Sequence, residues 1–346
     1  PHEIQQSMRE THPTSMSSVP RFWEKVYQAV KDKIERSNPV QQKLFRHALE
    51  VGRKYNLECK SRCKRPSPIL AMEYKVMDKM VLRLVRKQLG LENANIFPTA
   101  GAAVSPAVER FAHSVGINMV VGYGLTESLA TVSCDRENMP YTIGSVGRPI
   151  NGIDVKIGEN DEILLKGPTI TPGYYRHDAA NKAAFTEDGY FRTGDAGYIK
   201  DGELFLTDRI KDLFKTSNGK YIAPQMIESL LLVDRFIDQV VVIANERKFV
   251  SALIVPEFRL VEEWAKDHGI SADSREALCD DPKVQKMMME RIQTLQQQLA
   301  NYEQIKRFTL IAHHFSLESG ELTNTLKIRR PVIYKNFKEV IDKMYE

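Results

Sequence analysis

Short apolar runs bounded by glycine and proline predict the strands of this chain. Residues 117–121 are mainly apolar and rich in β-branched side chains, which predicts a buried strand. A shorter strand is expected at 95–98, and Ser105 followed by Pro106 predicts a helix start, with serine as N-cap and proline in the first turn. Strand, helix and strand in this order predict a parallel βαβ unit.

The apolar patterns before and after that unit predict helices on its N-terminal side and short strands on its C-terminal side. Helical spacing of apolar residues predicts a helix within 13–36, where Trp23 is expected in the core rather than in a pocket. Residues 39–90 predict two helices with a turn at 64–68. From 143 to 206 the pattern changes to short strands and turns, which favours a β-rich subdomain. Charged residues at 207–220 then interrupt the apolar pattern and indicate a domain boundary.

The predicted strand at 117–121 leads into the string GYGLTES at residues 122–128. Its glycines lack a Cβ and allow the backbone to approach a ligand closely. The ring of Tyr123, the hydroxyl of Thr126 and the carboxylate of Glu127 suit a base, a phosphate oxygen and a divalent cation. A strand-end turn with a surface Thr–Glu pair explains the string equally well at this point.

Two further segments carry candidate ligand-binding groups. Small residues at 99–103 follow the first strand of the βαβ unit, and sites in parallel sheets lie beyond the carboxyl ends of strands. Asp195 follows Thr193 and Gly194 in what we predict to be a loop. A carboxylate there accepts two hydrogen bonds from a vicinal diol such as ribose, and an Asx-turn is the alternative.

Length and composition narrow the class of protein. A length of 346 residues favours two domains, each with its own core. A charged content of 27% and a net charge of +4 favour an ordinary soluble protein rather than a nucleic-acid coat. No apolar run is long enough for a membrane span and no signal peptide is visible. The four cysteines lack metal-type spacing, which favours a reduced, cytoplasmic setting.

One segment differs strongly in charge from the rest. Residues 43–87 contain 13 Lys and Arg against four Asp and Glu, a net charge of +9, so the remainder of the chain carries −5. A basic helical hairpin of this kind fits an anionic membrane surface. Ordinary solvated helix faces are the alternative.

Three separated strings share an order and spacing with one known family. They are GYGLTES at 122–128, the segment from GYYR at 173–176 to FTEDGYFRTGD at 185–195, and ELTNTLKIRR at 321–330. Together they resemble the adenylate-forming acyl-CoA synthetases. VPRFWEK at 19–25, LANYEQIK at 299–306 and Leu326 before the lysine are similar to the long-chain fatty acyl branch.

This resemblance implies an α/β fold in two parts. Residues 1–210 would be the C-terminal part of the large AMP-binding domain, with a parallel βαβ sheet and a β-rich subdomain. Residues 211–346 would be a small mobile α+β domain with its hinge near Lys211. The implied activity is long-chain fatty acid–CoA ligation with ATP, Mg²⁺ and CoA. A ligase for short-chain, aromatic or amino acids and a non-catalytic nucleotide-fold protein are the alternatives.

The resemblance also implies roles for side chains in the first part. Tyr123 would stack on adenine, and Asp195 would accept hydrogen bonds from the ribose hydroxyls with Arg209 assisting. Thr126 would bond a phosphate, and Glu127 would hold the Mg²⁺ that bridges phosphate oxygens. The implied ATP- or AMP-binding positions are Gly101, Ala102, Ala103, Gly122, Tyr123, Gly124, Thr126, Asp195, Arg209 and Lys215.

In the second part, Lys327 would place its cation on the oxygens that join the substrate carboxylate and the α-phosphate. Lys327, Thr126 and Glu127 form the implied catalytic set. The loop around Gly219 would be presented to CoA.

The family also carries a Ser/Thr/Gly-rich phosphate loop that this chain lacks, and the chain begins at Pro1 rather than methionine. We therefore expect a C-terminal piece of a larger ligase, inactive alone. The expected partners are fatty acid, ATP and CoA, with no nucleic acid. Contact between an inner membrane face and the basic helices, and a homodimer through an uncovered sheet face, complete the expectations.

Overall fold

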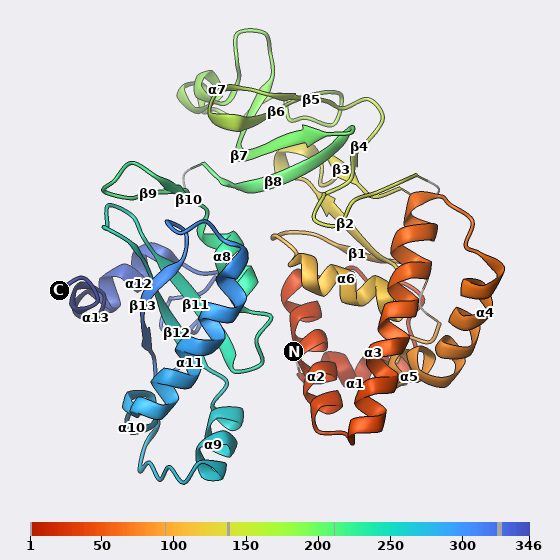
Figure 1. Ribbon diagram of the computed structural model, residues 1–346. Helices are drawn as coiled ribbons and strands as arrows, with labels where there is room; N and C mark the ends of the chain where they lie inside the picture. The colour runs from red at the N-terminus through yellow and green to blue at the C-terminus, as the bar shows by residue number, and fades with distance from the viewer. Residues whose placement is uncertain (1, 94, 137–138, 211, 324–326) are drawn as a thin grey trace. The chain divides into compact units, whose positions relative to one another are not determined.

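The chain folds into two units, Pro1–Ile210 and Lys211–Glu346 (Figure 1). The structure, a computed structural model, describes residues 2–93, 95–136, 139–210, 212–323 and 327–346.

A four-stranded sheet in the order β1-β2-β3-β4 forms the centre of the first unit. Strands β1 (Phe97–Thr99) and β2 (Met119–Tyr123) are parallel, and helix α6 (Pro106–Val115) connects them. The predicted βαβ unit is therefore confirmed. Ser105 is the N-cap residue of α6 as predicted, although its side chain makes no capping hydrogen bond. Strand β3 (Ser133–Cys134) pairs antiparallel with β2, and strand β4 (Arg148–Pro149) pairs antiparallel with β3.

Helices lie around this sheet (Figure 1), and the two predicted helical arms within 39–90 are present. The first arm begins at Asn38, whose side chain accepts the Gln41 N–H at 2.9 Å, and the second begins at Ser67, which caps Leu70 in the same way at 3.2 Å. Both arms contain a π-helical turn, at Lys54–Cys59 and Asp78–Leu82. The remaining helices of this unit are α1 (His2–Thr11), α2 (Pro20–Glu35), α3 (Pro39–Arg53), α4 (Pro68–Met77), α5 (Arg83–Leu89) and α7 (Asp178–Ala184).

Trp23 of α2 is buried, as expected, and fixes the edge of the sheet. Its indole Nε1–H donates to the hydroxyl of Ser18 at 2.7 Å and to that of Thr99, the last residue of β1, at 3.0 Å. This bond holds the end of β1, from which the loop at 100–103 continues.

A second, antiparallel sheet of the first unit has the order β5-β6-β7-β8. Backbone bonds from Val146 N to Leu204 O (2.8 Å) and from Leu204 N to Gly147 O (2.9 Å) join it to the first sheet. Its strands are β5 (Asp154–Ile157), β6 (Glu162–Lys166), β7 (Phe191–Lys200) and β8 (Glu203–Arg209).

The position of Asp195 in this sheet corrects the prediction. Asp195 lies inside strand β7 and pairs in register with Arg209 of β8, so the predicted loop at this point was wrong. Strand β7 pairs with a neighbour on each side, and that pairing supplies the order that the polar string Arg-Thr-Gly-Asp does not indicate locally.

The second unit has a three-stranded sheet in the order β11-β12-β13, with an almost completely buried middle strand. The pair β11/β12 is antiparallel and the pair β12/β13 is parallel. The strands are β9 (Phe214–Lys215), β10 (Tyr221–Ile222), β11 (Ile237–Ile243), β12 (Val250–Pro256) and β13 (Ile305–Leu310). The helices are α8 (Pro224–Leu231), α9 (Phe258–Asp267), α10 (Arg275–Asp280), α11 (Pro282–Leu295), α12 (Arg330–Asn336) and α13 (Lys338–Lys343).

Candidate functional site

Tyr123 and Asp195, which are 72 residues apart in the chain, meet in the first unit. The phenol of Tyr123 donates a hydrogen bond to Asp195 Oδ2 at 2.7 Å, and both residues are 7% exposed. Burial is the main cause, and the Asp195 charge the second, of a strong rise in the pKa of Tyr123. The phenol therefore keeps its proton and acts as a donor to the carboxylate.

Arg209 completes this contact from the neighbouring strand. Its guanidinium Nε lies 3.3 Å from Asp195 Oδ1, and more than half of its side chain is exposed. Asp195 thus has a buried neutral donor on one oxygen and a solvent-facing cation beside the other. Because the arginine end of this pair is exposed to solvent, its attraction to Asp195 is screened and contributes little stability, and the guanidinium stays accessible to a ligand.

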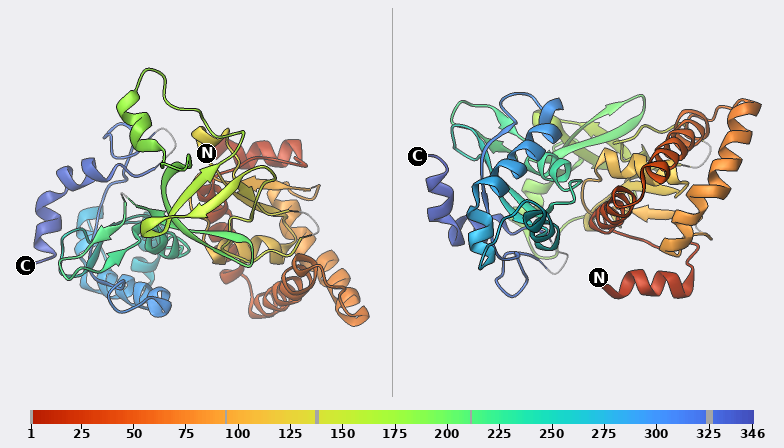
Figure 2. Two further views of the ribbon diagram at one scale, coloured as in Figure 1. Left: turned by 90° about the horizontal axis from the view of Figure 1, so that it is seen from above. Right: turned by 60° about the horizontal axis from the view of Figure 1, so that its bottom comes forward.

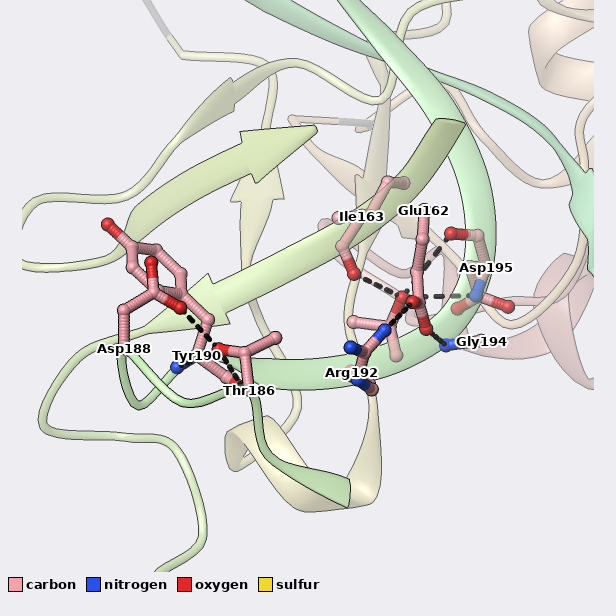
Figure 3. A network of polar contacts seen from close by, with 9 residues as sticks. Glu162, Ile163, Thr186, Asp188, Tyr190, Arg192, Gly194 and Asp195 are labelled. Carbon is pink, nitrogen blue, oxygen red and sulfur yellow. Dashed lines mark hydrogen bonds and ion pairs between the residues drawn. The ribbon is translucent and has the colours of Figure 1, made fainter. Parts of the chain in front are cut away.

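A network of polar contacts within β6 and β7 fixes the backbone at Asp195 (Figure 3). The Thr193 hydroxyl donates to Ile163 O at 2.7 Å and accepts the Asp195 N–H at 3.0 Å. Glu162 accepts the Gly194 N–H at 3.1 Å and pairs with Arg192 at 2.9 Å. These bonds fix the backbone from which the Asp195 side chain extends, and the Tyr123 phenol and the Arg209 guanidinium contact its carboxylate directly.

The turn that follows Tyr123 requires glycine at position 124. A Cβ added at Gly124 would lie 1.2 Å from the carbonyl oxygen of Ala130, because the chain folds back so closely there. Ala130 itself has a φ of +81°, a left-handed conformation that costs an alanine free energy. Gly122 is less restricted, since its added Cβ would lie 3.2 Å from Ser133 O.

Glu127 lies beside this turn with one carboxylate oxygen occupied. It belongs to a short 3-10 turn, Thr126–Ser128, and its Oε1 accepts the Tyr174 hydroxyl at 3.0 Å. The backbone carbonyl of Glu127 also accepts the Thr171 N–H at 2.7 Å. Thr126 is exposed next to Glu127. Asn181 of α7 holds the backbone of Tyr174 through bonds of 2.6 and 2.9 Å.

These groups fit a magnesium ion that a nucleotide also ligates. No described residue bonds the second carboxylate oxygen of Glu127, Oε2, and no cluster of three or more metal-ligating side chains occurs among the described positions. Mg²⁺ commonly takes one or two carboxylates and completes its coordination with water and substrate phosphates. A single half-buried carboxylate beside an exposed hydroxyl suits that mode of binding.

The loop Gly101-Ala102-Ala103 is exposed and follows β1. Because β1 and β2 are parallel and adjacent, this loop and the turn after Tyr123 start from the same edge of the sheet. Gly101 has a φ of +93°, and an added Cβ there would meet nothing within 4 Å. The sheet therefore brings the sequence-predicted small residues and the GYGLTES string to one edge.

The remaining predicted positions belong to the second unit. Lys215 ends β9, and its ammonium lies 5.8 Å from the ring centre of Tyr221 on β10. Gly219, with a φ of +76°, lies in the exposed turn between these strands, where its N–H bonds Thr216 O at 2.8 Å. The predicted hinge residue, Lys211, lies outside the described residues.

Lys327 has an exposed side chain in the second unit. Its backbone N–H bonds the Thr323 hydroxyl at 3.0 Å, and the Thr323 N–H bonds the Lys327 carbonyl at 2.8 Å. After this segment, α12 begins with Arg330, whose guanidinium makes two 2.8 Å bonds to the buried carboxylate of Glu228. That pair fixes the end of the lysine segment to α8.

Sequence reasoning missed two groups of residues that support the site. Tyr174 belongs to a quoted family string, yet its contact with Glu127 spans 47 residues and no local spacing predicts it. Glu162 and Thr193, which orient Asp195, look like ordinary polar positions in a β-rich segment. The register of β6 and β7 is the signal that would have found them.

Comparison with protein families gives two matches that together cover most of the chain. A family model described as AMP-binding enzyme matches residues 1–175. A model described as AMP-binding enzyme C-terminal domain matches residues 211–346.

Curated relatives match over nearly the whole chain. Long-chain-fatty-acid–CoA ligase FadD15 of Mycobacterium bovis is 30% identical over 96% of this chain and 55% of its own length. The peroxisomal long chain acyl-CoA synthetase 6 of Arabidopsis thaliana is 31% identical over 96% of this chain and 48% of its own. The chain thus spans about half the length of the curated relatives it matches.

Solved structures of similar fold include the adenylation domain of a carboxylate reductase from Mycobacterium chelonae. It has a TM-score of 0.71 and 23% identity, covering 99% of this chain and 48% of that one. O-succinylbenzoate coenzyme A synthetase from Bacillus subtilis, in complex with ATP and magnesium ion, has a TM-score of 0.56 and 18% identity, covering 95% and 53%. These likenesses confirm the predicted α/β fold class.

Proposed function

The chain belongs to the AMP-binding enzyme family, and from this premise we propose that the protein is a long-chain fatty acid–CoA ligase. In the first half-reaction a carboxylate oxygen of the fatty acid attacks the α-phosphorus of ATP, and pyrophosphate leaves. In the second, the CoA thiol attacks the acyl carbon, the thiol proton is released and AMP leaves. The names of the curated relatives support long-chain acids over the short-chain, aromatic, amino acid and non-catalytic alternatives.

The contact between Tyr123 and Asp195 is the observation that carries this proposal. A buried carboxylate, held in one orientation and flanked by an exposed arginine, suits the two hydroxyls of a ribose. The aromatic ring of Tyr123, whose hydroxyl makes this contact, suits an adenine base next to that ribose. We assign adenine to Tyr123 and the ribose hydroxyls to Asp195 and Arg209, with backbone around the base and acyl carbonyl from Gly101, Ala102, Ala103, Gly122 and Gly124.

Thr126 and Glu127 would hold the phosphate end. In this assignment the exposed Thr126 hydroxyl would donate to a phosphate oxygen, and the Glu127 carboxylate would hold Mg²⁺ while Tyr174 orients that carboxylate through Oε1. When bound, the cation neutralises negative charge on the phosphate oxygens. The role of Tyr174 is to keep the carboxylate of Glu127 from rotating.

The second unit would supply the moving groups. Lys327, exposed and without a described ion-pair partner, is free to place its ammonium on the oxygens where charge develops during adenylate formation. We assign a phosphate contact to Lys215, a CoA contact to the Gly219 turn, and the hinge to Lys211. The domains proposed are 1–210 for the large domain part and 211–346 for the mobile domain.

Pyrophosphate release by the whole protein, measured against a panel of carboxylic acids, tests the proposal. We expect release with acids of roughly 12 to 18 carbons, and a CoA-dependent AMP product. Release with short, aromatic or amino acids alone would move the protein to another branch of the family. No release with any acid, from protein that binds ATP, would contradict the ligase assignment.

Besides the substrates, we propose two further binding partners: a membrane surface and a second copy of the chain. We propose that the basic segment 43–87 contacts a membrane surface through its second helical arm. A homodimer is also proposed, and light scattering on the purified protein tests it.

A further inference from the structure

The second helical arm of the basic segment, residues 68–89, exposes a row of apolar side chains. Ile69, Met72, Val76, Met80 and Leu84 are each between 45% and 76% exposed. They recur every three or four residues, so each helical turn of the arm presents one of them on the same face. We call this row the apolar stripe. Scattered exposed apolar residues are ordinary, whereas a continuous row on one face indicates a surface with an occupant.

Cations accompany the apolar stripe along its length. Lys75, Lys79 and Arg83 directly precede Val76, Met80 and Leu84 in the sequence, and all three are exposed. Each of these turns therefore presents one cation beside one apolar side chain. Long basic side chains can extend past apolar neighbours to reach charged groups at an interface.

The acidic side chains of the basic segment are already engaged within it. Glu50 and Glu58 pair with Arg53, at 2.8 and 2.7 Å, and Asp78 pairs with Arg86 at 2.8 Å. Glu73 lies 3.2 Å from His47. Lys75, Lys79 and Arg83 pair with no carboxylate of the described residues, so their charge is available for an outside partner.

The first arm supports the second from behind. Helices α3 and α4 are neighbours in the hairpin (Figure 1; Figure 2 shows the same segments from two other sides). The rings of Tyr55 and Tyr74 stack between the arms with centroids 3.9 Å apart, and Leu82 is fully buried. The apolar stripe thus lies on a braced helix, which presents its face without unfolding.

We propose that the apolar stripe and its row of cations form a docking face for the surface of an anionic lipid bilayer. The apolar side chains would enter the boundary between headgroups and acyl chains, and the cations would contact lipid phosphates. A second copy of the chain is a poorer occupant, because pairing two such faces would bring like charges together. Every helix among the described residues is too short or too polar to span a bilayer, so the contact is peripheral.

This docking face would serve the ligase by placing it where long-chain acids partition, and that benefit rests on the proposed function. The lipid contact itself does not. Its test therefore contains no ATP, fatty acid or CoA, and a failed ligase assay leaves its result unaffected.

The experiment is co-sedimentation of the 346-residue chain with vesicles of phosphatidylcholine alone or with about a third phosphatidylglycerol. We expect binding to the anionic vesicles only, and weaker binding as sodium chloride rises from about 0.1 to 0.5 M. The triple variant Lys75→Gln, Lys79→Gln, Arg83→Gln should lose affinity by about fivefold per cation, or roughly 100-fold. The triple variant Met72→Ser, Val76→Ser, Met80→Ser should lose about tenfold or more while keeping its charge.

A matched control neutralises three exposed lysines elsewhere, with Lys182→Gln, Lys200→Gln and Lys266→Gln. It should bind within about twofold of the wild type, and circular dichroism should show that every variant is folded, since all the substituted side chains are surface-exposed. Equal losses in the control and in the cation triple would overturn the proposal, as would equal binding to both vesicle types. Light scattering that finds a dimer dissolved by the serine triple would assign the apolar stripe to a second copy instead.

Discussion

The corner formed by Tyr123 and Asp195 and the lysine segment around Lys327 are built in opposite ways. Asp195 is buried and held by a phenol, a guanidinium and a bonded backbone. Lys327 is exposed, and among the described residues its bonds are those of its backbone to Thr323. The first is shaped in advance of its ligand, and the second keeps its charged side chain available.

This difference suits the two tasks proposed for them. Binding a ribose benefits from groups fixed in advance, because ordering them at the moment of binding would cost free energy. A cation that stabilises charge only in the adenylation step needs to be present in that step alone. Substitutions in the two regions should therefore fail differently.

The largest expected effect is that of Lys327→Ala. In the whole protein it should slow adenylate formation by roughly 100- to 1,000-fold or more, because a positioned donor to a developing charge is lost. Formation of the thioester from supplied acyl-adenylate should survive. Stopped-flow measurement of the two half-reactions checks this, with Lys335→Ala, another exposed lysine of the second unit, as control. Equal losses in both half-reactions would remove the assigned role.

A rigid corner should also be sensitive to backbone crowding. Gly124→Ala should destabilise the first unit by about 3 kcal/mol or more, because the new Cβ would overlap the Ala130 carbonyl. Gly101→Ala, in the open loop, should cost only roughly 1 kcal/mol for its positive φ. Urea unfolding of the two variants measures both values. Equal costs would show that the turn after Tyr123 is not constrained as described.

The ring and the hydroxyl of Tyr123 should contribute separately. Tyr123→Phe removes the bond to Asp195 and keeps the aromatic face, so kcat/KM for ATP should fall about tenfold. Tyr123→Ala removes both and should cost at least a further fivefold. If the two variants lose the same amount, the ring has no part in binding the base.

The last prediction concerns a buried carboxyl away from the proposed site. Glu109 of α6 is fully buried, and burial raises its pKa to about 8, with Asp135 and Glu203 raising it further and the Gly144 N–H and Arg110 opposing. The folded state therefore holds this proton where the unfolded state has lost it, between about pH 4.5 and 8. The free energy of unfolding should fall as pH rises through that window, by about 1.4 kcal/mol per pH unit.

Nearby groups limit the range in which this can be measured. Burial lowers the pKa of His113 to about 4, which makes an opposite contribution below pH 6.5, and burial raises the pKa of Asp135 to about 7. Calorimetry between pH 6.5 and 8 measures the contribution of the carboxyls of Glu109 and Asp135 without that of His113. In this range, Glu109→Gln should reduce the slope of the free energy of unfolding against pH. An unchanged slope would place the titrating group elsewhere.

Much of the fold was predictable because local signals agreed. The apolar run before Gly122, and the serine and proline before α6, each indicated one element and together predicted the parallel pair β1/β2. The family strings, taken in their order along the chain, predicted which residues would form the site. Their roles stay predictions, since geometry alone does not identify a ligand.

Other features could not be predicted from local sequence. Asp195 lies in a strand because β7 pairs with β6 on one side and with β8 on the other, and no alternation of apolar residues in its own segment indicates this. The partners of Asp195 and Glu127 lie 72 and 47 residues away, so their contacts arise from sheet register and the path of the loop at 171–174. Sequence spacing holds no information on either.

The central claim is that the Asp195 carboxylate receives the ribose hydroxyls of ATP. The most direct measurement compares ATP with 2′,3′-dideoxy-ATP in the wild type and in Asp195→Ala, as a double-mutant cycle on kcat/KM. We predict that losing the hydroxyls costs the wild type roughly 10- to 100-fold and costs the variant almost nothing. Equal losses in the two proteins would contradict the account.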